Sequence, residues 1–100
     1  MNLVLIIHEI TLILTLIIGL IYIFKRNDGL KRTHFTLGLI TLFTIIIFLV
    51  QDSFSNMGYN VYGLLLLAVF ASMLFKKRSL VLHIALFIIA ISWLIAIHVI

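Results

Sequence analysis

The chain has 100 residues, of which 65% are hydrophobic and 10% are charged. Because an average soluble domain carries roughly 25% charged residues, this composition excludes a soluble enzyme, a secreted domain and a nucleic-acid-binding domain. The net charge of +4 does not indicate nucleic acid as a partner, since the basic residues gather in two short turns. Without cysteine, the chain can form neither a disulfide nor a thiolate metal site. We therefore predict an integral membrane protein.

Four long apolar runs follow one another along the chain. A bilayer core of about 30 Å needs roughly 20 apolar residues in helical form. In lipid, only helices or closed barrels satisfy the backbone, and four runs cannot close a barrel. We predict an all-α integral membrane protein, an antiparallel up-down-up-down four-helix transmembrane bundle that forms a single domain over residues 1–100. The expected helices cover about 3–24, 34–50, 59–75 and 80–100.

The first run could be mistaken for a signal peptide, but it lacks a basic start and a small-residue cleavage site, so we expect it in the mature protein.

The orientation in the membrane follows from the basic residues, which all lie in the first and third turns. The positive-inside rule places these turns in the cytoplasm and both termini outside a bacterial-type cytoplasmic membrane. The seven residues are Lys25, Arg26, Lys31, Arg32, Lys76, Lys77 and Arg78.

Each of the four histidines lies near the end of an expected helix. At about 1.5 Å rise per residue, His34 and His83 lie roughly 3 to 7 Å above the inner basic layer. His8 and His98 lie roughly 25 to 30 Å above it, so the two levels are about 22 Å apart. We expect an inner pair, His34 with His83, and an outer pair, His8 with His98. A single histidine at a helix end is most often an interfacial polar residue, so this interpretation depends on all four together.

Small residues share the helix faces of two of these histidines. Thr15 and Gly19 lie on the face of His8, and Gly38 and Thr41 lie on the face of His34, at about 100° per residue. Such faces leave room for a flat ring inside a bundle, although small residues also mediate ordinary helix packing in membranes.

Paired histidines at two depths suit haem, because haem iron takes two axial ligands on opposite faces and imidazole is a common one. We expect two haem b groups, with His8, His34, His83 and His98 as the iron ligands. A zinc or copper ion takes three or four ligands close together, which two histidines and Glu9 do not supply. No nucleophile–base constellation is present, so the function expected is electron transfer, either alone or as an oxidoreductase subunit.

The arrangement resembles the di-haem membrane cytochrome b family, which includes bacterial cytochrome b561 and the membrane subunits of formate dehydrogenase and nickel-iron hydrogenase. In the second helix, His34 is followed four residues later by Gly38, as in the family motif, and residues 93–99 around His98 are similar to its fourth-helix end. In that family the first and second helices give one ligand each, the third none and the fourth two. The resemblance implies electron transfer across the bilayer, with a quinone or a redox partner subunit as exchange partner.

Three features differ from the family pattern: the 15-residue spacing between His83 and His98 is one residue longer, Glu9 replaces an aromatic residue, and the expected N-terminus is outside.

Two other functions stay open. One is a small non-haem membrane subunit or assembly factor with interfacial histidines. The other is a small-multidrug-type transporter that uses Glu9, although the chain lacks the prolines of such transporters and their mechanism leaves the paired histidines unexplained.

Overall fold

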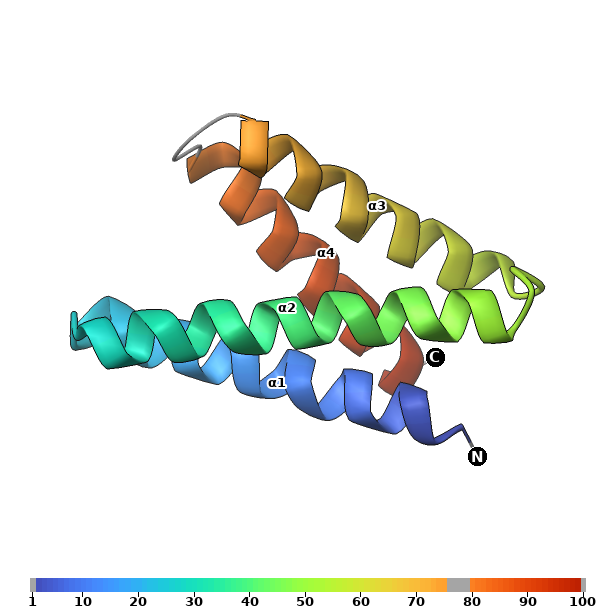
Figure 1. The fold of residues 1–100 in the computed structure, drawn as a ribbon, viewed down its shortest axis with the longest axis horizontal. Helices are drawn as coiled ribbons and strands as arrows, with labels where there is room; N and C mark the ends of the chain where they lie inside the picture. Colours follow the sequence, from blue (N-terminus) through green and yellow to red (C-terminus); the bar gives the residue numbers. More distant parts are fainter. Residues whose placement is uncertain (1, 76–79, 100) are drawn as a thin grey trace. The chain divides into compact units, whose positions relative to one another are not determined.

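The computed structural model describes residues 2–75 and 80–99, which form four helices (Figure 1). The helices are α1 (Leu3–Phe24), α2 (Asp28–Gln51), α3 (Met57–Phe75) and α4 (Leu80–Val99). Each is long and apolar enough to cross a membrane. The predicted class, all-α with four helices of spanning length, is confirmed.

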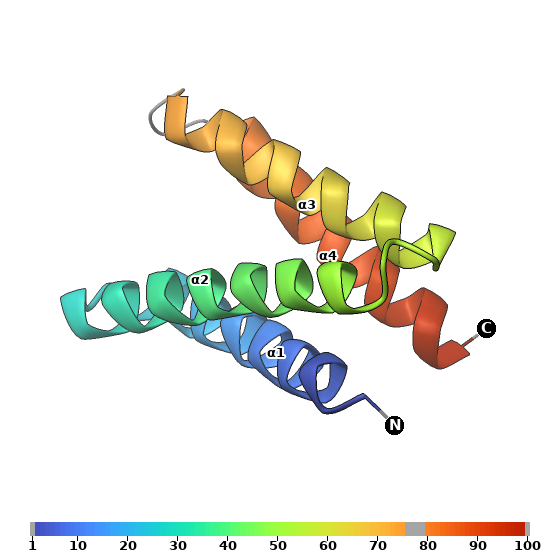
Figure 2. The same cartoon turned by 45° about the vertical axis from the view of Figure 1, so that its right-hand side comes forward.

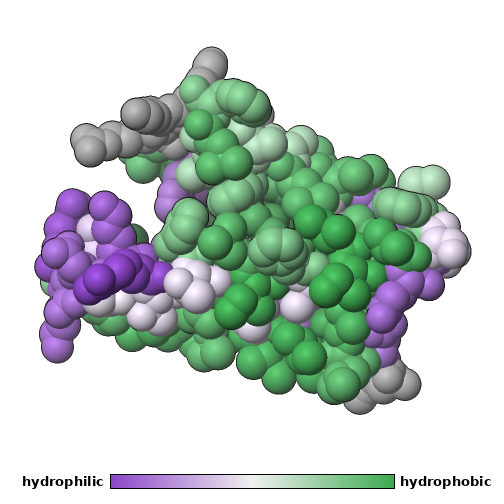
Figure 3. Space-filling model, viewed as in Figure 1, coloured by the Kyte–Doolittle hydropathy of each residue, from purple (hydrophilic) through white to green (hydrophobic). Residues whose placement is uncertain are grey.

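The chain divides into two compact units, Met1–Gln51 and Asp52–Ile100. Each unit is a helical hairpin, because α1 packs against α2 and α3 packs against α4. Both ribbon views show the paired helices side by side (Figures 1 and 2). On the face drawn in Figure 3, apolar side chains cover most of the helix surface, and hydrophilic side chains gather mainly at helix ends. This distribution suits helices that face acyl chains.

Asparagine side chains start the helices of the first hairpin. Asn2 Oδ1 accepts a hydrogen bond from the Val4 amide at 2.9 Å, and Asn27 Oδ1 accepts one from the Gly29 amide at 2.7 Å. Both satisfy amides that the first helical turn leaves without a partner. The Asn27 cap starts α2 at Asp28, six residues before the expected position, because the prediction followed the apolar run rather than the cap.

The remaining helix ends lie close to the expected ones. Asn56 Oδ1 accepts from the Tyr59 amide at 3.1 Å, and α3 begins at Met57, two residues before the expected start. Helix α1 has the predicted bounds. The predicted basic residues Lys76, Lys77 and Arg78 lie outside the described residues.

The turn between α2 and α3 contains two consecutive non-glycine residues in the left-handed region. Ser53 has φ 53° and Phe54 has φ 56°, a conformation that costs an L-residue roughly 1–2 kcal/mol. Two side-chain bonds hold this turn. Ser55 Oγ donates to Asp52 Oδ2 at 2.8 Å, and Asn60 Nδ2 donates to the carbonyl of Phe54.

The first hairpin combines a buried apolar core with buried polar side chains. The apolar members are Leu12, Leu42, Ile45, Phe48 and Leu49, and the polar ones are His8, Thr41 and Thr44. Buried polar groups need hydrogen-bond partners, and in lipid an unpartnered one is costly. These three polar residues are therefore the starting point for a functional site.

Candidate functional site

His8 is the most buried of the predicted ligands, with 3% of its surface exposed. It lies in the second turn of α1 and reaches across to α2. Its Nδ1 lies 2.9 Å from the Thr41 carbonyl oxygen and 3.1 Å from Thr44 Oγ1. Because a carbonyl oxygen can only accept, Nδ1 carries the proton.

His34 makes the mirror-image contact within the same hairpin. Its ring is half-buried on α2, and its Nδ1 lies 2.9 Å from the Thr15 carbonyl oxygen on α1. The same argument gives Nδ1 the proton in this ring. Each imidazole of the first hairpin is thus tied to a threonine carbonyl of the facing helix, and the two bonds run in opposite directions.

The tautomer of both rings follows from these bonds. A neutral imidazole with its proton on Nδ1 carries the lone pair on Nε2. Metal-ligating histidines commonly donate their second ring nitrogen to a carbonyl, which fixes the ring and makes the ligand nitrogen more basic. His8 and His34 therefore have the anchoring that an Nε2 iron ligand requires.

Gly19 makes room for the His34 ring. A Cβ atom at position 19 would lie 2.7 Å from Cε1 and 3.0 Å from Nδ1 of His34, closer than real side chains approach. Glycine therefore lets the ring lie against the α1 backbone, in reach of the Thr15 carbonyl. The ring fills the space that any larger residue at position 19 would occupy.

The threonine hydroxyls of the hairpin donate to their own helices. Thr15 Oγ1 donates to the Thr11 carbonyl at 2.6 Å, and Thr41 Oγ1 donates to the Leu37 carbonyl at 2.8 Å. Thr44 Oγ1 donates to the Thr41 carbonyl at 2.8 Å. This back-bonding is the usual way in which a mid-helix threonine satisfies its proton. It leaves the Thr44 oxygen as an acceptor for the His8 ring.

The register of the hairpin corrects the depth expected for the first two histidines. His8 contacts Thr41 and Thr44, which lie seven and ten residues along α2 from His34. The two rings are therefore about 10 to 15 Å apart along the hairpin, and the expected 22 Å is too large. The prediction measured His34 from Arg32, but α2 already begins at Asp28, so Arg32 does not mark the helix end.

The second hairpin carries the other two predicted ligands on one helix. His83 lies in the first turn of α4 and His98 in the last, and both side chains are exposed. Their 15-residue spacing corresponds to about 22 Å, longer than the spacing of the first two rings. The described contacts hold His8 and His34 within one hairpin. The inner pair, His34 with His83, and the outer pair, His8 with His98, stay predictions.

Glu9 follows His8 on α1 and is half-buried. One residue further along a helix, its side chain points about 100° away from that of His8. Within the described residues, no three His, Cys, Asp or Glu side chains gather where they could hold a metal ion. Histidine with a fixed tautomer is the chemistry that this hairpin offers.

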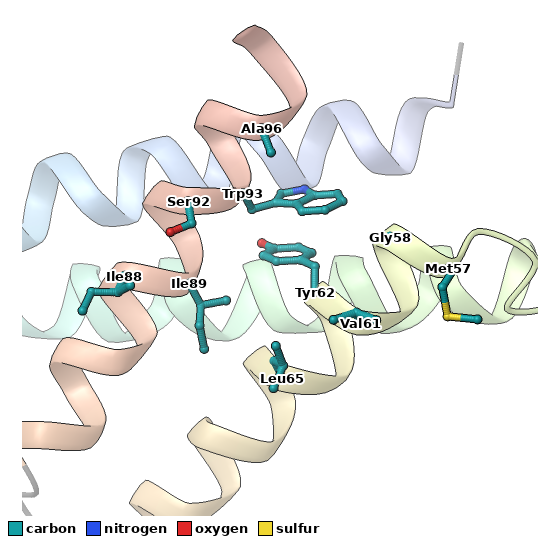
Figure 4. A pocket seen from close by; sticks show the side chains of 10 residues that line it. All are labelled: Met57, Gly58, Val61, Tyr62, Leu65, Ile88, Ile89, Ser92, Trp93 and Ala96. Carbon is teal, nitrogen blue, oxygen red and sulfur yellow. The ribbon is translucent and has the colours of Figure 1, made fainter. Parts of the chain in front are cut away.

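The second hairpin holds an apolar groove with a volume of about 550 Å³ (Figure 4). The Tyr62 and Trp93 rings stack in it with centroids 4.7 Å apart and an interplanar angle of 8°, and Tyr59 meets Trp93 edge-on at 4.8 Å. This aromatic cluster was not predicted from the sequence, although tyrosines three residues apart share a helix face. The lining residues are Met57, Gly58, Val61, Tyr62, Leu65, Ile88, Ile89, Ser92, Trp93 and Ala96.

The threonine anchors were foreseen only in part. Thr15, Gly19 and Thr41 lie on the predicted histidine faces, and the structure places all three at the rings. Thr44 was missed, although its position three residues after Thr41 would have placed it near that face.

Comparison of the chain with protein-family models, with curated proteins and with solved structures finds no match.

Proposed function

We propose that this protein is a b-type membrane cytochrome in which His8 and His34 each provide an axial ligand through Nε2. One observation carries the proposal: both rings give their Nδ1 proton to a backbone carbonyl of the facing helix, at 2.9 Å in each case. A histidine placed only for its polarity at a membrane interface needs no such fixed orientation, whereas an iron ligand does.

The second ligands in this proposal are those predicted from the sequence, His83 for His34 and His98 for His8. Bound haem supplies a one-electron carrier whose potential depends on its ligands and on burial. The chain's own residues hold the rings: Thr41 and Thr44 orient His8, and Thr15 and Gly19 orient His34. Electrons would pass across the bilayer to or from a quinone or a partner subunit.

Ring spacing bears on the number of haems. The His8 and His34 rings are about 10 to 15 Å apart along their hairpin, whereas His83 and His98 are about 22 Å apart along α4. Because the two spacings are unequal, the proposed pairing of His34 with His83 and of His8 with His98 would give one haem or two. The ratio of haem to protein decides between a mono-haem and a di-haem protein.

The test is an absorption spectrum of the full chain, purified in detergent after expression with adequate haem, oxidised and then reduced with dithionite. We expect sharp α and Soret bands of bis-histidine haem b. His8→Ala and His34→Ala should each lower the haem content, and added imidazole should restore it. A colourless wild-type protein would refute the proposal and favour the non-haem subunit.

Orientation is a separate part of the proposal. With the basic turn at 25–32 in the cytoplasm, both termini lie outside. Because the chain has no cysteine, single cysteines at Asn2 and Arg26 can be labelled in intact cells with a membrane-impermeant maleimide. Labelling of position 2 alone supports the orientation, and labelling of position 26 alone overturns it.

A further inference from the structure

The turn between α1 and α2 concentrates positive charge that the hairpin does not neutralise. Four exposed basic side chains lie within eight residues, and the turn has a single acid, Asp28. Among the residues that the structure describes, none of the four forms an ion pair, either with Asp28 or with another acid. The basic residues are Lys25, Arg26, Lys31 and Arg32.

Several backbone amides of the turn are committed to bonds within the hairpin, whereas its four basic side chains are exposed. The Lys25 amide donates to the Ile21 carbonyl at 2.8 Å and closes α1. The Gly29 amide, at the start of α2, donates to Asn27 Oδ1. The exposed side chains offer ammonium and guanidinium groups, which are the usual partners of phosphate oxygens.

Apolar side chains lie directly on the membrane side of these cations. Phe24 ends α1 with 81% of its surface exposed, and Phe35 is 55% exposed on α2. Leu20 and Ile23 are also exposed on the last turns of α1. Hydrophilic side chains gather at this end of the hairpin, with apolar side chains next to them (Figure 3). The turn thus presents cations at headgroup depth and hydrocarbon beneath them.

We propose that the α1–α2 turn binds the phosphate groups of anionic phospholipids. A lipid fits both halves of the surface, since its phosphate meets the cations and its acyl chains meet the exposed phenylalanines. A soluble phosphate would use the cations alone. Each basic residue near an anionic surface strengthens attraction by roughly fivefold at low salt, and salt screens the effect. The inference does not depend on haem binding.

A label beside the turn tests this in the full chain. The chain has no cysteine, so Phe24→Cys and Leu3→Cys place one fluorophore at either end of α1, and both positions are exposed. The labelled proteins are reconstituted in phosphatidylcholine vesicles. A fixed fraction of nitroxide-labelled phosphatidylglycerol or nitroxide-labelled phosphatidylcholine serves as quencher. We expect phosphatidylglycerol to quench position 24 several-fold more than phosphatidylcholine, with no such difference at position 3.

Charge variants identify the cause. The excess quenching at position 24 should disappear in K25Q/R26Q/K31Q/R32Q and survive in the charge-conserving K25R/R26K/K31R/R32K. It should grow in D28N, which removes the only acid of the turn. It should also fall between about 0.01 M and about 1 M salt. Equal quenching by the two lipids at position 24, an equal excess at position 3, or an excess that survives neutralisation each overturns the proposal.

Discussion

The imidazole of His34 lies against the backbone of Gly19, so that a Cβ atom at position 19 would stand 2.7 Å from Cε1 of the ring. The position of the His34 ring therefore depends on the absence of a side chain at position 19. In the same hairpin, a Cβ atom at Gly38 would meet Thr15 Cγ2 at 3.9 Å, an ordinary van der Waals distance. The two glycines are therefore a matched pair.

We expect Gly19→Ala to displace the His34 ring and break its bond to the Thr15 carbonyl. The strain should lower the free energy of unfolding by about 1–3 kcal/mol, partly offset by the gain of roughly 1 kcal/mol from alanine in a helix. Gly38→Ala should be neutral or stabilising. Unfolding in detergent mixed with dodecyl sulfate, followed by circular dichroism, measures both. Equal effects of the two substitutions would show that the ring contact does not constrain the hairpin.

Thr44→Val removes the hydroxyl that accepts from His8 and keeps the shape of the side chain. Interhelical hydrogen bonds in membranes contribute about 0.6 kcal/mol on average and at most about 1.7 kcal/mol, so we expect a loss of that size. If haem is bound, its reduction potential should also shift. Thr33→Val is the control, since Thr33 Oγ1 is exposed and donates only to the Gly29 carbonyl. A potential that is unchanged in the Thr44 variant argues against His8 as a ligand.

Asn27→Ala removes the cap of α2 in the turn between two packed helices. A lost cap costs about 1 kcal/mol, and here the cost should appear in global unfolding because both helices depend on the turn. Asn2→Ala removes the matching cap of α1, which lies at the open end of the hairpin and can fray locally. We expect the Asn27 variant to be the less stable of the two. The opposite order would mean that the turn contributes little to hairpin stability.

Ser53→Gly and Phe54→Gly should each stabilise the α2–α3 turn by about 1 kcal/mol, because glycine adopts positive φ without steric cost. Ser55→Gly is the control, since it removes the hydroxyl bond to Asp52 and should destabilise. Thermal unfolding of the three purified variants separates them. Loss of stability in both the Ser53 and the Phe54 variant would contradict the left-handed conformation of this turn.

Hydropathy predicted the four helices because each apolar run is long enough to span a bilayer, and α1 has the expected bounds. The start of α2 could not be obtained in that way. Its first four residues, Asp28 to Lys31, include only one apolar side chain, Leu30, and the helix begins there because of the Asn27 cap. A local hydrogen bond, rather than hydropathy, determines this helix end.

The candidate site was predicted at the level of helix faces. Periodicity placed Thr15 and Gly19 on the face of His8, and Thr41 on that of His34, but it could not give the register between α1 and α2. That register depends on the turn and on which carbonyl each ring meets. For this reason the depth of His34 was wrong, and the role of the Thr44 hydroxyl could not be foreseen.

The direction of the threonine hydroxyls has a consequence for how α1 and α2 hold together. The contact between Thr15 Oγ1 and Thr41 Oγ1 is 3.4 Å, while each proton is committed to a closer carbonyl of its own helix. With both protons directed into their own helices, the two hydroxyls face each other mainly through lone pairs, and their contact adds little attraction between α1 and α2. The closer polar links between these two helices are the bonds from the imidazoles, so either ring, if lost, would loosen the seam of the hairpin.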